Sequence, residues 1–206
     1  MFACAIFAAG RLYSKMIRFI LLLFVTLATG SVWADSYVGV EPVSFGSRSY
    51  SQLDKYWLES PNIIVCDEIR ITRSRVHSAV RYWERLGYSF GDIEYNSDDE
   101  ACRGGNASGN IVITIPDQSF DFTNLAMTRC YFNSHTKEIL YSVIQMPDAN
   151  TRKERVLEHE IGHALGWGHS PRRQYMMNHN WELGGYDSTG LKHSRYLELI
   201  GNIISN

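Results

Sequence analysis

The chain has 206 residues, of which 45% are hydrophobic, and it carries 20 Lys and Arg residues against 22 Asp and Glu residues. The formal net charge of −2 argues against nucleic acid or an anionic membrane as the main partner, because both attract strongly basic proteins. The length suits a single domain built around one hydrophobic core.

Residues 1–34 are predicted to be a signal peptide and not part of the fold. Three basic residues precede an apolar run over residues 19–28, and small residues end the segment at Ala34. The run is shorter than the roughly 20 residues that a membrane span needs, so an uncleaved anchor is the less favoured alternative. We expect a secreted or periplasmic protein with no stable membrane insertion after cleavage, and Met16 is an alternative start of the signal peptide.

Removal of this segment would leave 17 basic and 22 acidic residues, a net charge of −5. Residues 35–60 then mix aromatic residues and serines with little periodicity. They are expected to be either an N-terminal arm packed on the domain or a short pro-segment over its cleft. Residues 61–206 contain the readable elements.

The first predicted helix begins with Thr72 or Ser74 as its N-cap and ends near Leu86. Its buried stripe is expected to contain Val76, Val80, Trp83 and Leu86, and its largely solvated residues to be Arg73, Arg75, Arg81 and Arg85. The predicted strands are Asn62–Cys66, Ile93–Tyr95, Ile111–Ile115, Leu125–Phe132 and Glu138–Met146.

Three cysteines remain after signal cleavage: Cys66, Cys102 and Cys130. One disulfide and one free thiol are expected in an oxidising compartment, and all three pairings stay open. We favour Cys102–Cys130, because Cys102 lies in a polar loop while Cys66 is predicted to be buried in a strand.

The strongest pattern of the chain is H-E-x-x-H-x-x-G-x-x-H, which begins at His159 and ends at His169. Because helix residues four apart lie above one another, His159 and His163 can present imidazole nitrogens to one metal ion. Glu160 can reach a water on that metal, and Gly166 can end the helix and return the chain to His169. Three histidines leave a fourth zinc position open, which is typical of catalytic sites.

The helix around this pattern is predicted to be capped by Asn150 or Thr151. Its core-facing stripe is expected to contain Leu157, Ile161, Ala164 and Leu165. The histidines would then lie on the opposite side, where a cleft can open.

The extended pattern resembles the metzincin zinc metallopeptidases, and in particular their matrixin-like branch. Met177 follows His169 at the spacing of the family's methionine turn, with Met176 as the alternative, and Ser170 is also matrixin-like. His179 departs from the family, because matrixins usually have proline there. It is expected to be exposed, or less often a neighbour or fifth ligand of the metal.

The resemblance implies an α/β (α+β) metzincin-like catalytic domain over residues 61–206. Its sheet would be twisted and mostly parallel, with about five strands and an antiparallel edge strand, followed by an active-site helix and a C-terminal helix, Leu191–Ile204. The edge strand would be Leu125–Phe132, to which a peptide could add. The segment 178–190 would wall the pocket for the residue after the cut bond. The loop 96–106 could hold Ca²⁺, as family loops often do, although a solvated loop is favoured.

The function implied is that of a secreted zinc-dependent endopeptidase. One Zn²⁺ would be bound by His159, His163 and His169, and Glu160 would activate the zinc-bound water. The partner would be a protein or peptide substrate, and the protein is expected to be a monomer. Two alternatives are a non-catalytic zinc-containing binding or adhesion module with the same fold, and a zinc hydrolase of non-peptide amides.

Overall fold

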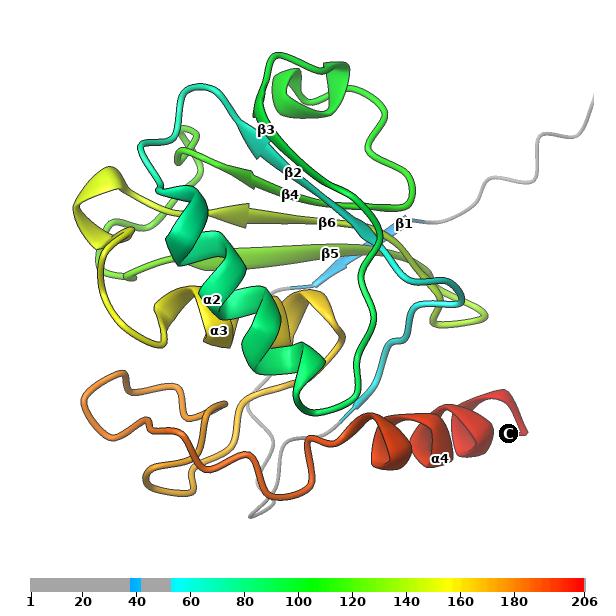
Figure 1. The fold of residues 1–206 in the computed structure, drawn as a ribbon. Coiled ribbons are helices and arrows are strands. Elements are labelled where there is room, and N and C mark those ends of the chain that lie inside the picture. The colour runs from blue at the N-terminus through cyan, green and yellow to red at the C-terminus, as the bar shows by residue number, and fades with distance from the viewer. Residues whose placement is uncertain (1–37, 42–52, 206) are drawn as a thin grey trace, which may run out of the picture. The chain divides into compact units, whose positions relative to one another are not determined.

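The computed structural model describes residues 38–41 and 53–205, which belong to one compact unit, Tyr37–Asn206 (Figure 1). The predicted signal peptide, residues 1–34, lies outside the described residues. Of the predicted arm, only residues 38–41 and 53–60 are described. None of the described helices has the length and apolar character that a membrane crossing needs.

A six-stranded sheet forms the frame of this unit, in the order β1-β5-β6-β4-β2-β3. Strands β6, β4, β2 and β3 are parallel neighbours, whereas β5 runs antiparallel to β6. The strands are β1 (Val38–Glu41), β2 (Asn62–Cys66), β3 (Ile93–Ser97), β4 (Asn110–Thr114), β5 (Met127–Asn133) and β6 (Ile139–Gln145). The predicted α/β fold, with its mostly parallel sheet and antiparallel strand, is confirmed, and β1 is an addition to it.

Strand β1 covers part of β5, which was expected to be the free edge. It pairs antiparallel with β5 from Val38 opposite Asn133 to Glu41 opposite Cys130. The prediction of an exposed edge over Leu125–Phe132 is therefore wrong for residues 130–132. Among the described strands, none pairs with β5 at Met127–Arg129 on this side, so no described strand covers this edge of the stretch.

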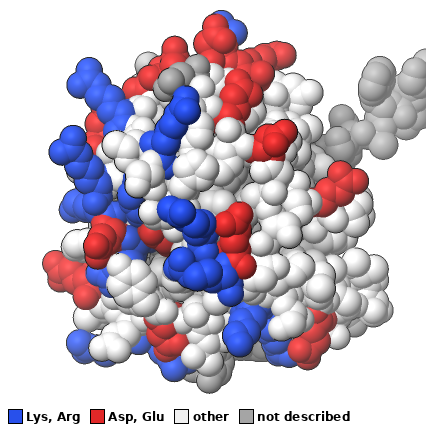
Figure 2. Space-filling view, in the orientation of Figure 1, with Lys and Arg blue, Asp and Glu red and all other residues white. Residues whose placement is uncertain are grey.

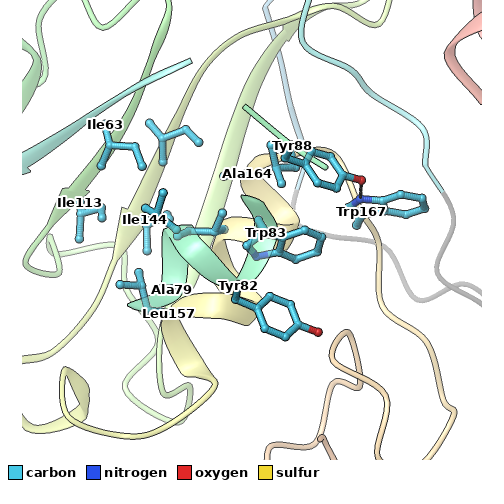
Figure 3. Packing of buried hydrophobic residues seen from close by; sticks show 14 of the residues in the cluster. Ile63, Ala79, Tyr82, Trp83, Tyr88, Ile113, Ile144, Leu157, Ala164 and Trp167 are labelled. Carbon is cyan, nitrogen blue, oxygen red and sulfur yellow. Dashed lines mark hydrogen bonds between the residues drawn. The ribbon is translucent and has the colours of Figure 1, made fainter. Parts of the chain in front are cut away.

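Two helices cover one face of the sheet (Figure 1). Helix α2 (Arg73–Glu84) packs against α3 (Val156–Ala164), which in turn contacts β5 and β6. The side chain of Thr72 accepts a hydrogen bond from the Arg75 amide, so Thr72 is the N-cap. The main core lies between these helices and the sheet, and Figure 3 shows among its members Ile63, Ala79, Trp83, Ile113, Ile144 and Leu157.

The disulfide joins Cys66 to Cys102, so the predicted pairing of Cys102 with Cys130 is wrong. Cys66 ends β2 and faces a second, smaller cluster on the other side of the sheet. The 3-10 helix η1 (Glu100–Arg103) brings Cys102 to that cluster. Cys130 faces α3 instead, where its thiol donates to the carbonyl of His163 over 3.2 Å. Cys66 is buried in a strand, as predicted, but it forms the disulfide, so its burial did not indicate a free thiol.

The C-terminal helix α4 (His193–Ile204) is anchored through Tyr196, whose hydroxyl accepts a hydrogen bond from the Trp57 amide over 2.8 Å. Leu197 and Ile204, which were expected on one apolar side with Ile200, are 55% and 62% exposed. Leu199, Ile200 and Ile203 pack against the main core beside the buried Tyr196, so the prediction was right for Ile200 and wrong for Leu197 and Ile204.

Candidate metal centre

Helix α3 carries the first part of the histidine pattern, and it begins later than predicted. Asn150 and Thr151 use their side chains elsewhere, because Asn150 donates to the carbonyl of Leu125 and Thr151 to that of Asp148. The N-cap is Arg155, in the left-handed conformation with a φ of 69°. The prediction that Asn150 or Thr151 caps the helix is therefore wrong.

Helix α3 has a core-facing side and a cleft-facing side, as the sequence predicted. The core-facing stripe is buried and contains Leu157, Ile161, Ala164 and Leu165. On the opposite side, His159, Glu160 and His163 line a cleft of about 930 Å³. One wall of this cleft is the free part of β5, Met127–Arg129.

The turn after α3 depends on Gly166, which has a φ of 98°. A Cβ atom here would lie 2.1 Å from the carbonyl oxygen of Lys55, so no other residue fits without moving the backbone. The turn brings His169 back to the helix. Its Nε2 atom lies 3.2 Å from that of His159 and 3.0 Å from that of His163.

The three imidazoles form the one group of potential metal ligands found among the described residues. The Nδ1 atom of His159 lies 2.8 Å from the carbonyl oxygen of Met176, and that of His163 lies 2.7 Å from the carbonyl oxygen of Trp167. Because a carbonyl only accepts, both Nδ1 atoms must carry a hydrogen. In neutral rings, the lone pairs of both Nε2 atoms then face each other across 2.9 Å. A cation between them is the arrangement that makes this geometry favourable, so the residues fit zinc.

Burial keeps these histidines neutral. It lowers the pKa of His159 to about 4 and that of His169 to about 3, and it lowers the pKa of His163 well below the ordinary value. Neutral imidazole is the form that binds a metal, so protons compete weakly at this site.

Zinc should consequently stay bound in mildly acidic solution. Because the pKa of His159 is lowered to about 4 and that of His169 to about 3, we expect about one zinc per chain from pH 7 down to about pH 5, and release only as the pH falls through about 4. Metal analysis after dialysis at each pH measures this. Release of half the zinc at pH 6.5 or above would contradict the neutral, buried ligand set.

Glu160 lies beside the histidines, buried at the base of the cleft. Its Oε2 atom accepts a 2.6 Å hydrogen bond from the hydroxyl of Thr128, on β5. Burial raises the pKa of Glu160 to about 7, and the Thr128 hydrogen bond opposes the rise. The carboxyl group can therefore both take up and release a proton near neutral pH. The sequence did not predict the contact of Thr128 with Glu160, because a single threonine in a strand is common.

Met177, the methionine singled out in the sequence, packs on the helix that carries two of the histidines. Met177 is completely buried and packs on α3 at Gly162, where a Cβ atom would come within 2.4 Å of its sulfur. Met176 contributes its backbone carbonyl to His159. His179 is exposed and lines the cleft, with its ring centroid 6.2 Å from that of His169, and it is outside the ligand group.

An ion pair holds the start of α3 in place. The guanidinium of Arg75 on α2 donates to both carboxylate oxygens of Glu158, over 2.7 and 2.5 Å. The Arg75 side chain is only 14% exposed, so the expectation that it is solvated is wrong. Trp83 adds a 2.8 Å hydrogen bond from its indole to the carbonyl of Glu158, the residue next to His159.

Breaking this pair should destabilise the whole domain. In Arg75→Met the Glu158 carboxylate stays buried without its partner, and we expect a loss of about 3–5 kcal/mol in the free energy of unfolding. Arg81→Met is the matched control on the exposed side of α2, with an expected change below about 0.5 kcal/mol. Urea unfolding of both variants gives the two values, and equal values would contradict the role of the pair.

Comparison with known families agrees with this geometry. Residues 70–196, which include both helices and the three histidines, match the family model described as matrixin. None of the curated proteins is similar enough to the chain to count as a match.

Proposed function

Because the chain belongs to the matrixin family of metallopeptidases, we propose that it is an exported zinc-dependent endopeptidase. The observation that supports this most directly is the pair of Nε2 lone pairs of His159 and His163 that face each other across 2.9 Å. A buried carboxyl group beside an open cleft is the second requirement for peptide hydrolysis, and Glu160 meets it.

In this proposal, His159, His163 and His169 hold Zn²⁺ as neutral imidazoles. When bound, zinc lowers the pKa of a coordinated water and polarises the carbonyl group of the substrate. Glu160 takes a proton from the attacking water and delivers it to the leaving amine, with Thr128 holding the carboxylate in position. Met176 and Trp167 fix the rings of two ligands through their carbonyls.

The peptide would bind as an added strand along Met127–Arg129. An antiparallel arrangement, like that of β1 on the same strand, places the part before the cut bond toward Cys130 and the part after it toward Leu125. Because Thr128 contacts Glu160, the bond to be cut lies next to the middle of this stretch. Because β1 already pairs with β5 from Cys130 onward, the peptide can pair with β5 only up to that residue.

The experiment that tests the proposal is digestion of an unstructured protein such as casein by the purified protein, with and without a zinc chelator. Mass spectrometry of the products should reveal internal cuts that the chelator abolishes and added zinc restores. Stoichiometric zinc without any cut would favour the binding module. Hydrolysis of small non-peptide amides alone would favour the other alternative.

A further inference from the structure

The cleft has a cationic end beyond His159, which the catalytic proposal does not use. Lys153 and Arg155 line the cleft there, in the loop before α3, together with Trp181 from the segment after the methionine turn. On the left-hand side of Figure 2, the side on which this loop lies in Figure 1, several Lys and Arg side chains are interspersed with Asp and Glu side chains. Trp181 is 37% exposed, so it is a wall of the cleft and not part of the core.

Arg155 is held rigidly in this wall. Its Nη1 donates to the carbonyl of Gly184, and its guanidinium carbon lies 5.6 Å from the ring centroids of both Trp181 and Tyr186. The Nε atom is buried and has no hydrogen-bond partner. Burial keeps the Nε atom out of reach of the cleft, but a guanidinium group has five N–H donors, so its terminal nitrogens can still donate to an anion there.

Lys153 stands beside it, with its ammonium nitrogen 5.1 Å from the centroid of Trp181. Within the described part of the chain, neither Lys153 nor Arg155 forms an ion pair with a carboxylate. Arg129, the third cation of the cleft, differs in this respect, since it pairs with Asp117 over 3.3 Å. The acidic Glu182 also lines the cleft but pairs with neither cation. The Glu154 carboxylate lies at the same wall, where it accepts a 3.1 Å hydrogen bond from the hydroxyl of Tyr186. The two positive charges next to Trp181 nevertheless have no direct ion-pair partner among the described residues.

The cationic end lies on the side to which the C-terminal part of the substrate would run. Asn150 donates a 2.7 Å hydrogen bond to the carbonyl of Leu125, which ties the loop before α3 to the segment that leads into β5. A peptide antiparallel to β5 passes Met127 and then Leu125 after the cut bond. Its next residues therefore reach Lys153 and Arg155.

We propose that Lys153 and Arg155 bind a carboxylate of the substrate on the C-terminal side of the cut bond. The carboxylate comes either from an Asp or Glu side chain within the first three residues after that bond or from a free C-terminus at the same distance. This inference rests on the proposed peptidase function and adds a preference for acidic substrates to it.

The test uses a peptide with an internal cut site taken from the casein digest, varied only after the cut bond. Glu is compared with the isosteric Gln at each of the three following positions, and a peptide that ends there is compared with its C-terminal amide. We expect kcat/KM to be about tenfold higher for the carboxylate form in one of these pairs, and less so at high salt. The pair that responds identifies the source of the carboxylate.

Lys153→Gln should reduce this ratio about fivefold, and Lys153→Glu should reverse it. Arg152→Gln is the matched control, because it removes the same charge from the neighbouring exposed residue outside the cleft, and it should leave the ratio unchanged. Equal kcat/KM for Glu and Gln forms at all positions, with cleavage intact, would overturn the carboxylate site alone. Absence of cleavage in every peptide and in casein would instead overturn the peptidase function.

Discussion

Glu160→Gln is expected to retain one zinc per chain and to lose almost all activity, with kcat lower by about 10²–10⁴-fold. Glutamine has the shape of glutamate and its amide oxygen can still accept the hydrogen bond of Thr128, so the fold and the ligand set stay in place. It cannot take up the proton of the attacking water. The measurement is the rate of peptide cleavage together with the zinc content of the same sample.

Glu198→Gln provides the matched control for this substitution. Glu198 is an exposed residue of α4 outside the cleft, so the same chemical change there should alter neither zinc content nor rate. Wild-type activity in Glu160→Gln would exclude the proton transfer assigned to Glu160. Loss of zinc from Glu160→Gln would mean that the carboxylate belongs to the ligand set.

His163→Ala is expected to lose both metal and activity. The substitution removes one of three ligand nitrogens and leaves two, and the carbonyl of Trp167 loses its donor as well. Since changes in groups that only orient a ligand already cost 10–100-fold in metal affinity, we expect the loss of the ligand itself to exceed about 100-fold. Competition with a chromogenic zinc chelator measures the affinity, and circular dichroism checks that the variant is folded.

The control for this variant is His135→Ala, in the exposed turn between β5 and β6. The backbone amide of residue 135, which donates to Asn133, is retained in alanine. Zinc affinity and activity should therefore equal those of the wild type. Equal zinc affinity in His163→Ala and the wild type would contradict the three-histidine site.

The arrangement of the site could be predicted because it is encoded locally. His159, Glu160 and His163 occupy neighbouring turns of one helix, and Gly166 provides the positive φ that returns His169 to them. Helix geometry fixes the relation of the first three residues, and the glycine turn fixes that of His169. The strand segments were likewise readable as short apolar runs, whereas their mostly parallel order was implied by the resemblance to the metzincins.

Features that depend on pairing between distant segments could not be predicted. The disulfide partner of Cys66 is set by η1, whose path a polar loop sequence does not specify. Strand β1 pairs with β5 from a segment that has almost no periodicity. Arg75 was expected to be solvated because it lies outside the predicted buried stripe of its helix, and only the position of Glu158 on α3 shows why it is buried.

In the proposed mechanism, a metal held by the three histidines acts together with the Glu160 carboxyl group to cleave peptide bonds. The most direct measurement is the rate of cleavage as zinc is returned stepwise to chelator-stripped protein, in parallel with Glu160→Gln. We expect the wild-type rate to rise in proportion to bound zinc and to level off at one zinc per chain, while the variant binds the same zinc without activity. Cleavage by the metal-free wild type, or full occupancy without any cleavage, would contradict the claim.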